Sequence, residues 1–95
     1  MTYDLDYFIT KFSAITEDKW ITGKYTDGDC HCAYGHCGMT HMVRDTKESY
    51  ALFNIDISAK ESITRINDGL SDAELAFGTT PKQRVVNYLK SLRDA

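Results

Sequence analysis

The side chains that could support chemistry are concentrated in one segment, W-I-T-G-K-Y-T-D-G-D-C-H-C-A-Y-G-H-C-G-M-T-H, which runs from Trp20 to His41. It contains the only tryptophan, all three cysteines, all three histidines and four of the six glycines of the 95-residue chain. Thiolates and imidazoles are the ligands that zinc prefers, and a thiol beside a histidine can act as a nucleophile. Three interpretations of the segment therefore compete.

The first interpretation is a zinc site whose candidate ligands are Cys30, Cys32, Cys37, His36 and His41. Their spacing lacks the two separated ligand pairs that are typical of zinc ribbons. On one continuous helix, Cys30, Cys37 and His41 would share a face, and Cys32 and His36 would lie on the opposite face. Four ligands would therefore require an unwound start of the helix or a ligand from elsewhere.

The second interpretation is a thiol nucleophile activated by a histidine. Cys32 precedes His36 by four residues, and Cys37 precedes His41 by four residues. Such a pair also needs an orienting group and an oxyanion pocket, and the sequence indicates neither. Thiol-dependent catalysis therefore has only the spacing in its favour.

The third interpretation is that the small side chains of this segment allow close packing, since free cysteine is among the most buried residue types. Gly35 and Gly38 would then let another backbone approach, and Cys37 would be shielded in the middle of a helix. Trp20 would belong to the core, against the N-terminal helix. We favour this interpretation, under which the chain is not an enzyme and has no cofactor; zinc is the alternative cofactor.

The elements before and within the segment are predicted as two helices and a hairpin. Apolar residues at helical spacing predict a helix over residues 3–16 that Thr2 caps. The Asp27–Gly28 pair favours a tight reversal, so a short hairpin is expected from about Tyr25 to Cys30. A helix is predicted over residues 30–43. The apolar stripe of the first helix is Leu5, Phe8, Ile9, Phe12 and Ile15.

The second half of the chain is predicted as short helices, because four residue pairs have capping-box spacing. The first of these helices has an ambiguous end, since residues 53–57 also alternate like a strand. A second helix is expected to end near Asp68–Gly69, residues 71–78 form one turn or a loop, and Pro81 begins the last helix. The four pairs are Asp45/Glu48, Ser58/Glu61, Ser71/Glu74 and Thr80/Gln83. The positive side chains expected on the solvated face of the last helix are Lys82, Arg84, Lys90 and Arg93.

Together these elements predict a mainly α (small α+β) fold: a compact bundle of about four to five short helices with a small irregular β-hairpin. The chain is expected to form a single domain over residues 1–95, because its 95 residues are about enough for one core. The domain is expected to be globular, because hydrophobic residues make up 42% and charged residues 26% of the chain.

The charge and hydropathy patterns exclude several classes of partner. The net charge is −3 and the charges are interspersed, which argues against a nucleic-acid-binding protein. No apolar stretch approaches the ~20 residues that span a bilayer. The N-terminus, M-T-Y-D-L-D, lacks the features of a signal peptide. We therefore expect a cytoplasmic protein that binds neither nucleic acid nor a membrane.

Four short motifs, W-I-T-G, C-A-Y-G-H-C-G, I-N-D-G and T-P-K-Q-R-V-V-N-Y-L, occur in this order between Trp20 and Leu92. In this arrangement the chain resembles an uncharacterised family of small phage and bacterial proteins, a domain of unknown function. His36 and Cys37 match only part of that family, which puts a family-wide zinc or catalytic role in doubt. The residues that match the family pattern are Trp20, Gly23, Cys32, Ala33, Gly35, Asn67, Asp68, Thr80 and Arg84.

The resemblance implies a phage or mobile-element gene whose product lies in the host cytoplasm, and it implies no chemistry. Together with the small size and the lack of a catalytic motif, it indicates a non-enzymatic accessory protein that acts by protein–protein interaction. Inhibition of a host defence or replication component is one form that this function can take. Neither the sequence nor the resemblance indicates the binding residues or the oligomeric state. The alternative is a zinc-binding or thiol-dependent protein that uses the Cys30–His41 cluster.

Overall fold

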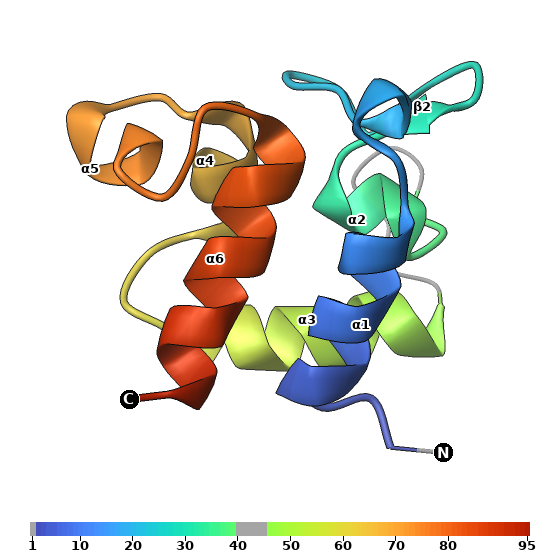
Figure 1. Ribbon diagram of the computed structural model, residues 1–95. Coiled ribbons are helices and arrows are strands. Elements are labelled where there is room, and N and C mark those ends of the chain that lie inside the picture. Colours follow the sequence, from blue (N-terminus) through green and yellow to red (C-terminus); the bar gives the residue numbers. More distant parts are fainter. Residues whose placement is uncertain (1, 40–45) are drawn as a thin grey trace.

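The computed structural model describes residues 2–39 and 46–95, which form six α-helices, one 3-10 helix and a two-stranded hairpin (Figure 1). This confirms the predicted fold class, with four longer helices and two of a single turn. In chain order the elements are α1 (Leu5–Ala14), η1 (Glu17–Lys19), β1 (Thr26–Asp27), β2 (Cys30–His31), α2 (Ala33–His36), α3 (Lys47–Ser58), α4 (Ile63–Asp68), α5 (Asp72–Leu75) and α6 (Pro81–Arg93).

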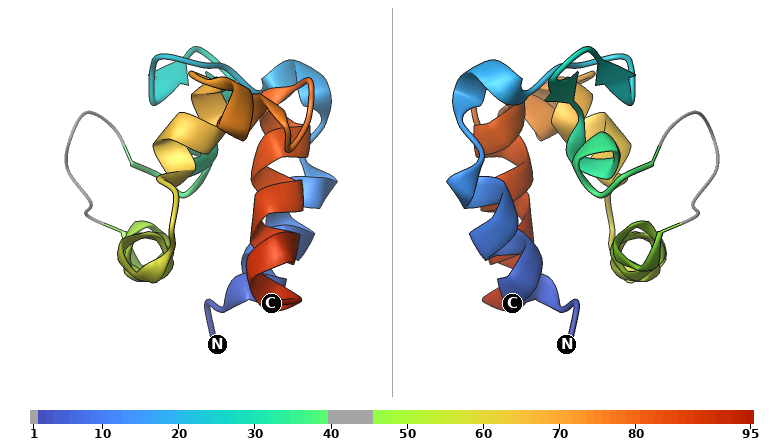
Figure 2. Two further views of the ribbon diagram at one scale, coloured as in Figure 1. Left: turned by 90° about the vertical axis from the view of Figure 1, so that its left-hand side faces the viewer. Right: turned by 90° about the vertical axis from the view of Figure 1, so that its right-hand side faces the viewer.

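The first and last helices, α1 and α6, lie side by side and run in opposite directions, so both ends of the chain are at the same end of the molecule (Figures 1 and 2). The predicted apolar stripe of α1 is buried at Phe8, Ile9 and Phe12. Its cap is Asp4, whose carboxylate accepts from the Tyr7 backbone N–H at 2.9 Å, and the prediction of Thr2 as the cap was wrong. These two helices form one wall of the core.

The predicted hairpin is confirmed, because β1 and β2 pair antiparallel around Gly28, which has a φ of 62°. The predicted helix over residues 30–43 was wrong over its described part. Cys30 lies in β2, and α2 begins only at Ala33 and ends at His36. Gly38, with a φ of 89°, is incompatible with a continuing helix. Residues 40–43 of that prediction lie outside the described part.

Gly35 allows α2 to lie directly against the chain that leads into the hairpin. A Cβ atom at this position would be 1.8 Å from the carbonyl oxygen of Tyr25, which no conformational adjustment of a side chain could relieve. The expectation that Gly35 permits a close backbone approach is therefore confirmed.

In the second half, α3 is a helix through Ile57, and the alternative strand over residues 53–57 does not form. Its capping box consists of Thr46 and Ser49: Ser49 N–H donates to the Thr46 hydroxyl and Thr46 N–H donates to the Ser49 hydroxyl. Ser49, not the predicted Glu48, therefore takes the third position of the box. Asp45, the other predicted member, lies outside the described residues.

The other three predicted capping pairs had mixed outcomes. Ser58 is the last residue of α3, so the pair with Glu61 was wrong. Ser71 precedes α5 but makes no side-chain cap, and its hydroxyl donates to the carboxylate of Glu74. Thr80 caps α6 as predicted by accepting from Gln83 N–H at 3.2 Å. The Gln83 side chain, however, accepts from Thr79 N–H, one residue earlier than a capping box requires.

Helix α3 crosses the α1–α6 pair and lies to one side of it, as the view along its axis shows (Figure 2). It buries only Ser49 and Leu52 of its twelve residues. Glu48 joins it to α1, accepting from the Tyr7 hydroxyl and from Lys11 Nζ at 2.9 Å. These polar contacts add to the apolar packing of Leu52, Phe53 and Ile55 against the core. Over the described ranges, no helix is long and apolar enough to cross a membrane.

Candidate functional site

Those candidate metal ligands that the structure describes lie in a strand, in a short helix and in the residues that flank this helix. Cys30 is in β2 and its thiol donates to the carbonyl of Asp18 at 3.3 Å, whereas Cys32 and Cys37 are the residues that flank α2. The helical face proposed for Cys30 and Cys37 does not exist, because Cys30 is in a strand. Among the residues with described positions, no three or more His, Cys, Asp or Glu side chains are arranged to hold a metal ion. His41 lies outside them, so the zinc interpretation stays a hypothesis.

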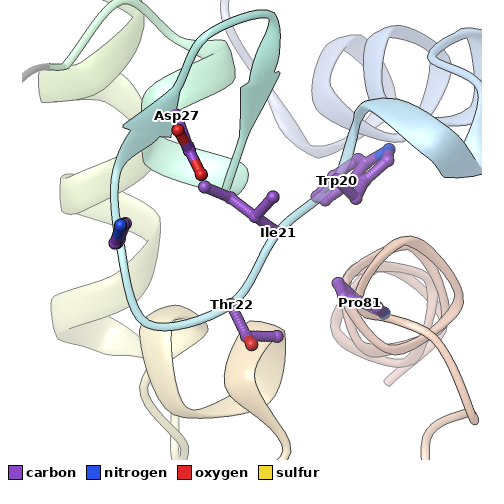
Figure 3. A pocket seen from close by; sticks show the side chains of 6 residues that line it. Trp20, Ile21, Thr22, Asp27 and Pro81 are labelled. Carbon is purple, nitrogen blue, oxygen red and sulfur yellow. The ribbon is translucent and has the colours of Figure 1, made fainter.

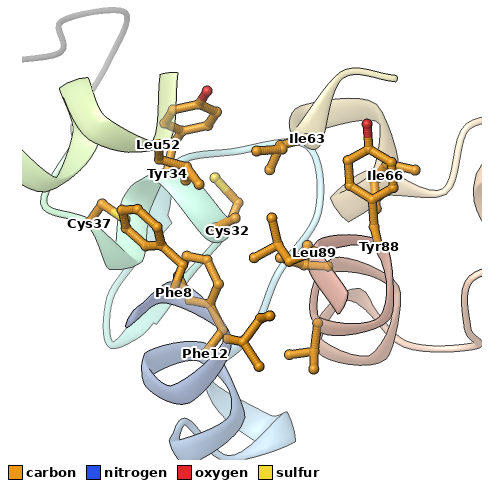
Figure 4. Packing of buried hydrophobic residues seen from close by; sticks show 14 of the residues in the cluster. Phe8, Phe12, Cys32, Tyr34, Cys37, Leu52, Ile63, Ile66, Tyr88 and Leu89 are labelled. Carbon is orange, nitrogen blue, oxygen red and sulfur yellow. The ribbon is translucent and has the colours of Figure 1, made fainter. Parts of the chain in front are cut away.

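Two of the three thiols lie in the hydrophobic core (Figure 4). Cys32 is 6% exposed and Cys37 is 1% exposed. Burial raises the pKa of Cys32, outweighing the hydrogen bonds from the backbone of Gly35 and Tyr34 that lower it. Burial also raises the pKa of Cys37 to about 12. Both groups are therefore neutral thiols at physiological pH, which is the opposite of what a cysteine nucleophile requires.

Trp20 is buried against the N-terminal helix, as the sequence predicted. Its ring contacts Phe12 edge to face at 5.4 Å between centroids and also lies 4.6 Å from the ring of His36. His31 completes this ring cluster at 5.1 Å from His36. Burial, together with repulsion from His31, lowers the pKa of His36 to about 4, so this imidazole is uncharged at neutral pH.

Asn67, one of the motif residues, connects α4 to two other segments through its buried side chain. Its amide oxygen accepts from the N–H of Ala33 at 3.1 Å, at the first residue of α2. Its amide nitrogen donates to the carbonyl of Ile21 at 2.9 Å and to the carboxylate of Asp68 at 3.0 Å. The same Asp68 oxygen accepts from Gly23 N–H at 3.1 Å. The Asn-Asp pair therefore holds the W-I-T-G loop and α2 against α4.

Arg84 continues this network from the other side of α4. It is 4% exposed, and its Nε and Nη2 donate to the carbonyls of Ile66 and Asn67 at 2.9 and 2.8 Å. These carbonyls lie at the C-terminal end of α4, where backbone acceptors lack helical partners and the helix dipole favours a positive charge.

The prediction that Arg84 lies on a solvated face was therefore wrong. The signal that could have revealed its burial is its position next to Val85 and one turn before Tyr88, both of which are buried. We call Asn67, Asp68 and Arg84 the polar hub. It links most of the residues that matched the family pattern, and its role is structural.

Two hollows adjoin the W-I-T-G loop. One of about 460 Å³ lies between this loop and the first turn of α6, with Trp20, Ile21 and Pro81 among its walls (Figure 3). The other, of about 260 Å³, includes Cys32 and Asp68. The carboxylate of Asp68 raises the pKa of the Cys32 thiol further, so this arrangement does not favour a thiolate. Neither hollow pairs a reactive nucleophile with a base.

Within the described residues, a further candidate for function is the outer surface of α3. Large apolar side chains are exposed at Tyr50 and Ile57 on α3, and at Leu70 and Leu75 around α5. Tyr50 is 57% and Ile57 is 65% exposed, and their separation of seven residues places them on one face of the helix. Sequence reasoning assigned Tyr50 to this helix but gave it no binding role.

Comparison of the chain with protein-family models, with curated proteins and with solved structures finds no match. The resemblance to the family of small phage and bacterial proteins therefore stays a prediction, and the function has to be argued from the geometry.

We expect Asn67→Ala to lower the free energy of unfolding by about 3 kcal/mol, because it leaves the buried Ala33 N–H and Ile21 carbonyl without partners. Urea denaturation measures this. The matched control is Asn54→Ala, at an exposed position of α3, which should change stability by less than about 0.5 kcal/mol. If Asn67→Ala changed the free energy of unfolding as little as Asn54→Ala does, the hydrogen bonds of Asn67 would be dispensable for stability.

We expect stability to fall as the pH decreases from about 6.5 to about 4. In this range His36 becomes protonated in the unfolded chain, where its pKa has the ordinary value of 6.5. In the folded chain His36 stays uncharged, because its pKa there is about 4. Between these two pH values the free energy of unfolding should fall by about 2 kcal/mol more in the wild type than in His36→Gln. This is less than the full linkage value, because the His36 side chain is partly exposed. Carboxylate titration is common to both proteins and cancels. Parallel pH profiles would contradict this assignment.

We expect Cys37 to be alkylated far more slowly than Cys30 by iodoacetamide at neutral pH in the folded protein. Cys37 is 1% exposed with a pKa of about 12, whereas Cys30 is half-buried in the hairpin. Peptide mass spectrometry after timed quenching gives both rates. In urea the two rates should converge, and fast modification of Cys37 in native protein would revive the thiol-dependent alternative.

Proposed function

We propose that this chain is a non-enzymatic accessory protein that acts by binding another protein through the outer face of α3. The observation that carries the proposal is the exposure of Tyr50 and Ile57 two turns apart on one helix face. Aromatic and large aliphatic side chains at such spacing are the usual anchors of helix-mediated recognition.

The way in which α3 is attached supports this proposal. Its inner side is held by polar contacts: Glu48 with Tyr7 and Lys11, and Asp56, which accepts from the Tyr34 hydroxyl at 2.6 Å. Burial pushes the pKa of Glu48 up, but the Tyr7 hydroxyl and Lys11 hold it below its ordinary value, so Glu48 remains charged in this contact. Together with Leu52, which is in the core, and with Phe53 and Ile55, which pack against it, these contacts fix the inner side of the helix. Tyr50 and Ile57 take no part in that packing and are exposed to a partner.

A hollow of about 270 Å³ lies beside the C-terminal half of α3, on the side that is turned to α1 and α6. It is lined by Leu5, Ile55, Ser58, Ala59 and Leu92, four of which are apolar. Ile57 is two residues from both Ile55 and Ala59 and therefore lies on the opposite side of the helix, so the proposed contact does not use this hollow.

The setting that we propose follows from the sequence. The resemblance implies small phage and bacterial proteins of the host cytoplasm, and we propose this as the setting, in which inhibition of a host defence or replication component is one form of such binding. The net charge of −3 disfavours nucleic acid and anionic membranes as partners. The raised pKa values of Cys32 and Cys37 support a non-enzymatic role over the thiol-dependent alternative.

Affinity purification of the tagged chain from cells that express the gene tests this proposal. We expect one protein to be retained in stoichiometric amount by the wild type and to be lost with the double variant Tyr50→Ser/Ile57→Ser. The matched control is Leu70→Ser/Leu75→Ser, which removes the other exposed apolar pair and should retain the partner. Circular dichroism checks that both variants are folded.

Two results would count against the proposal. Retention of no protein by the wild type would remove the binding function, and equal retention by both double variants would remove the role of α3.

A further inference from the structure

We infer that the partner of α3 is a different protein with an apolar groove and an acidic rim, and is not a second copy of this chain. This inference rests on the proposed function and specifies the chemistry of the partner. It follows from the distribution of charge on α3, from the symmetry that a second copy would impose, and from the size of the helix.

The outer face of α3 is apolar in the middle and has one exposed lysine at its N-terminal end, and a second exposed lysine follows shortly after its C-terminal end. Lys47, Tyr50, Asn54 and Ile57 are all exposed and follow one another at intervals of three, four and three residues, which defines one stripe of the helix. Lys60 is exposed two residues after the helix ends. In the described part of the chain, neither Lys47 nor Lys60 forms an ion pair. Both charges are therefore available to a partner.

The acidic residues of α3 do not belong to this stripe. Glu48 is directed to Lys11 and Tyr7 of α1, and Asp56 accepts from Tyr34 and from Ile63 N–H at 3.0 Å. The exposed stripe thus has a positive local charge on a chain whose net charge is −3. A complementary surface is apolar where it meets Tyr50 and Ile57 and negative at its edges.

A second copy does not meet this requirement. In an antiparallel twofold pair that places Tyr50 opposite Ile57 of the other copy, Lys47 lies at the end of the contact where the other copy's chain leaves α3 toward its Lys60. In a parallel twofold pair, Lys47 faces Lys47 of the other copy. Either arrangement brings like charges together at the ends of the contact, where repulsion weakens association.

The size of the helix also favours a concave partner. Twelve residues of α3 extend about 18 Å and a helix is about 10 Å wide. A flat contact on one such face buries far less than the ~800 Å² that each partner contributes to a standard interface. A groove that surrounds the ridge covers more of the helix, and helices with anchors at one-turn and two-turn spacing are typically recognised in this way.

Site-specific photocrosslinking tests the inference in cells that express the gene. p-Benzoylphenylalanine replaces Tyr50 in one version of the chain, Ile57 in a second and, as the control, Leu70 in a third. We expect crosslinks to one other protein from positions 50 and 57 and none to that protein from position 70. Mass spectrometry of the crosslinked product identifies the protein, which is then purified for binding measurements.

The binding measurements examine the acidic rim. We expect Lys47→Glu/Lys60→Glu to weaken binding of the crosslinked protein by at least about tenfold, and binding to weaken as salt is raised. The matched control is Lys24→Glu/Lys90→Glu, which changes the net charge equally at exposed positions outside α3 and should reduce binding by less than about twofold.

The other outcomes are distinguishable. Crosslinks to a second copy, to lipid or to nucleic acid from position 50 or 57 overturn the inference. If a protein is crosslinked but charge reversal at Lys47 and Lys60 does not weaken its binding, the binding function stands and the acidic rim is wrong. If a protein is crosslinked from position 70 alone, the role of α3 is overturned. If no protein is crosslinked from any of the three positions, the proposed binding function is overturned as well.

Discussion

The interaction on which the rest of the structure depends is the polar hub at the C-terminal end of α4. A buried arginine side chain is costly unless its donors are satisfied, and here Arg84 donates to the backbone acceptors of Ile66 and Asn67. Asn67 in turn satisfies the backbone of Ile21 and Ala33. The loop after Trp20, α2, α4 and α6 are thus connected by buried hydrogen bonds, and breaking any of them would leave a buried polar group unpaired.

The hub explains why the cysteine–histidine segment is a packing element. Once Asn67 fixes the start of α2 and Gly35 brings it against the backbone of Tyr25, Cys32 and Cys37 face the core. Burial then keeps both thiols protonated and His36 uncharged. For these three side chains a low dielectric disfavours the charged forms, which are the forms that thiol or imidazolium chemistry would need.

Helix α3 differs physically from this core. Its inner side joins the core through Leu52, Phe53 and Ile55 and is also held by the carboxylates of Glu48 and Asp56, whereas Tyr50 and Ile57 on its outer face are exposed. Under the proposed function, Tyr50 and Ile57 would supply the apolar contact with the partner, and Lys47 and Lys60 would select the partner through charge.

The sequence alone determined the features that depend on local interactions. The apolar period of α1, the Asp27–Gly28 turn and the Thr80–Pro81 start of α6 each follow from a few neighbouring residues. The burial of Arg84, the short length of α2 and the exposure of α3 were decided by the tertiary structure. Arg84 finds its acceptors about eighteen residues away, as the 17- and 18-residue separations of its bonds show. Periodicity reports which face of a helix is apolar, but only packing decides which faces meet and which remain for a partner.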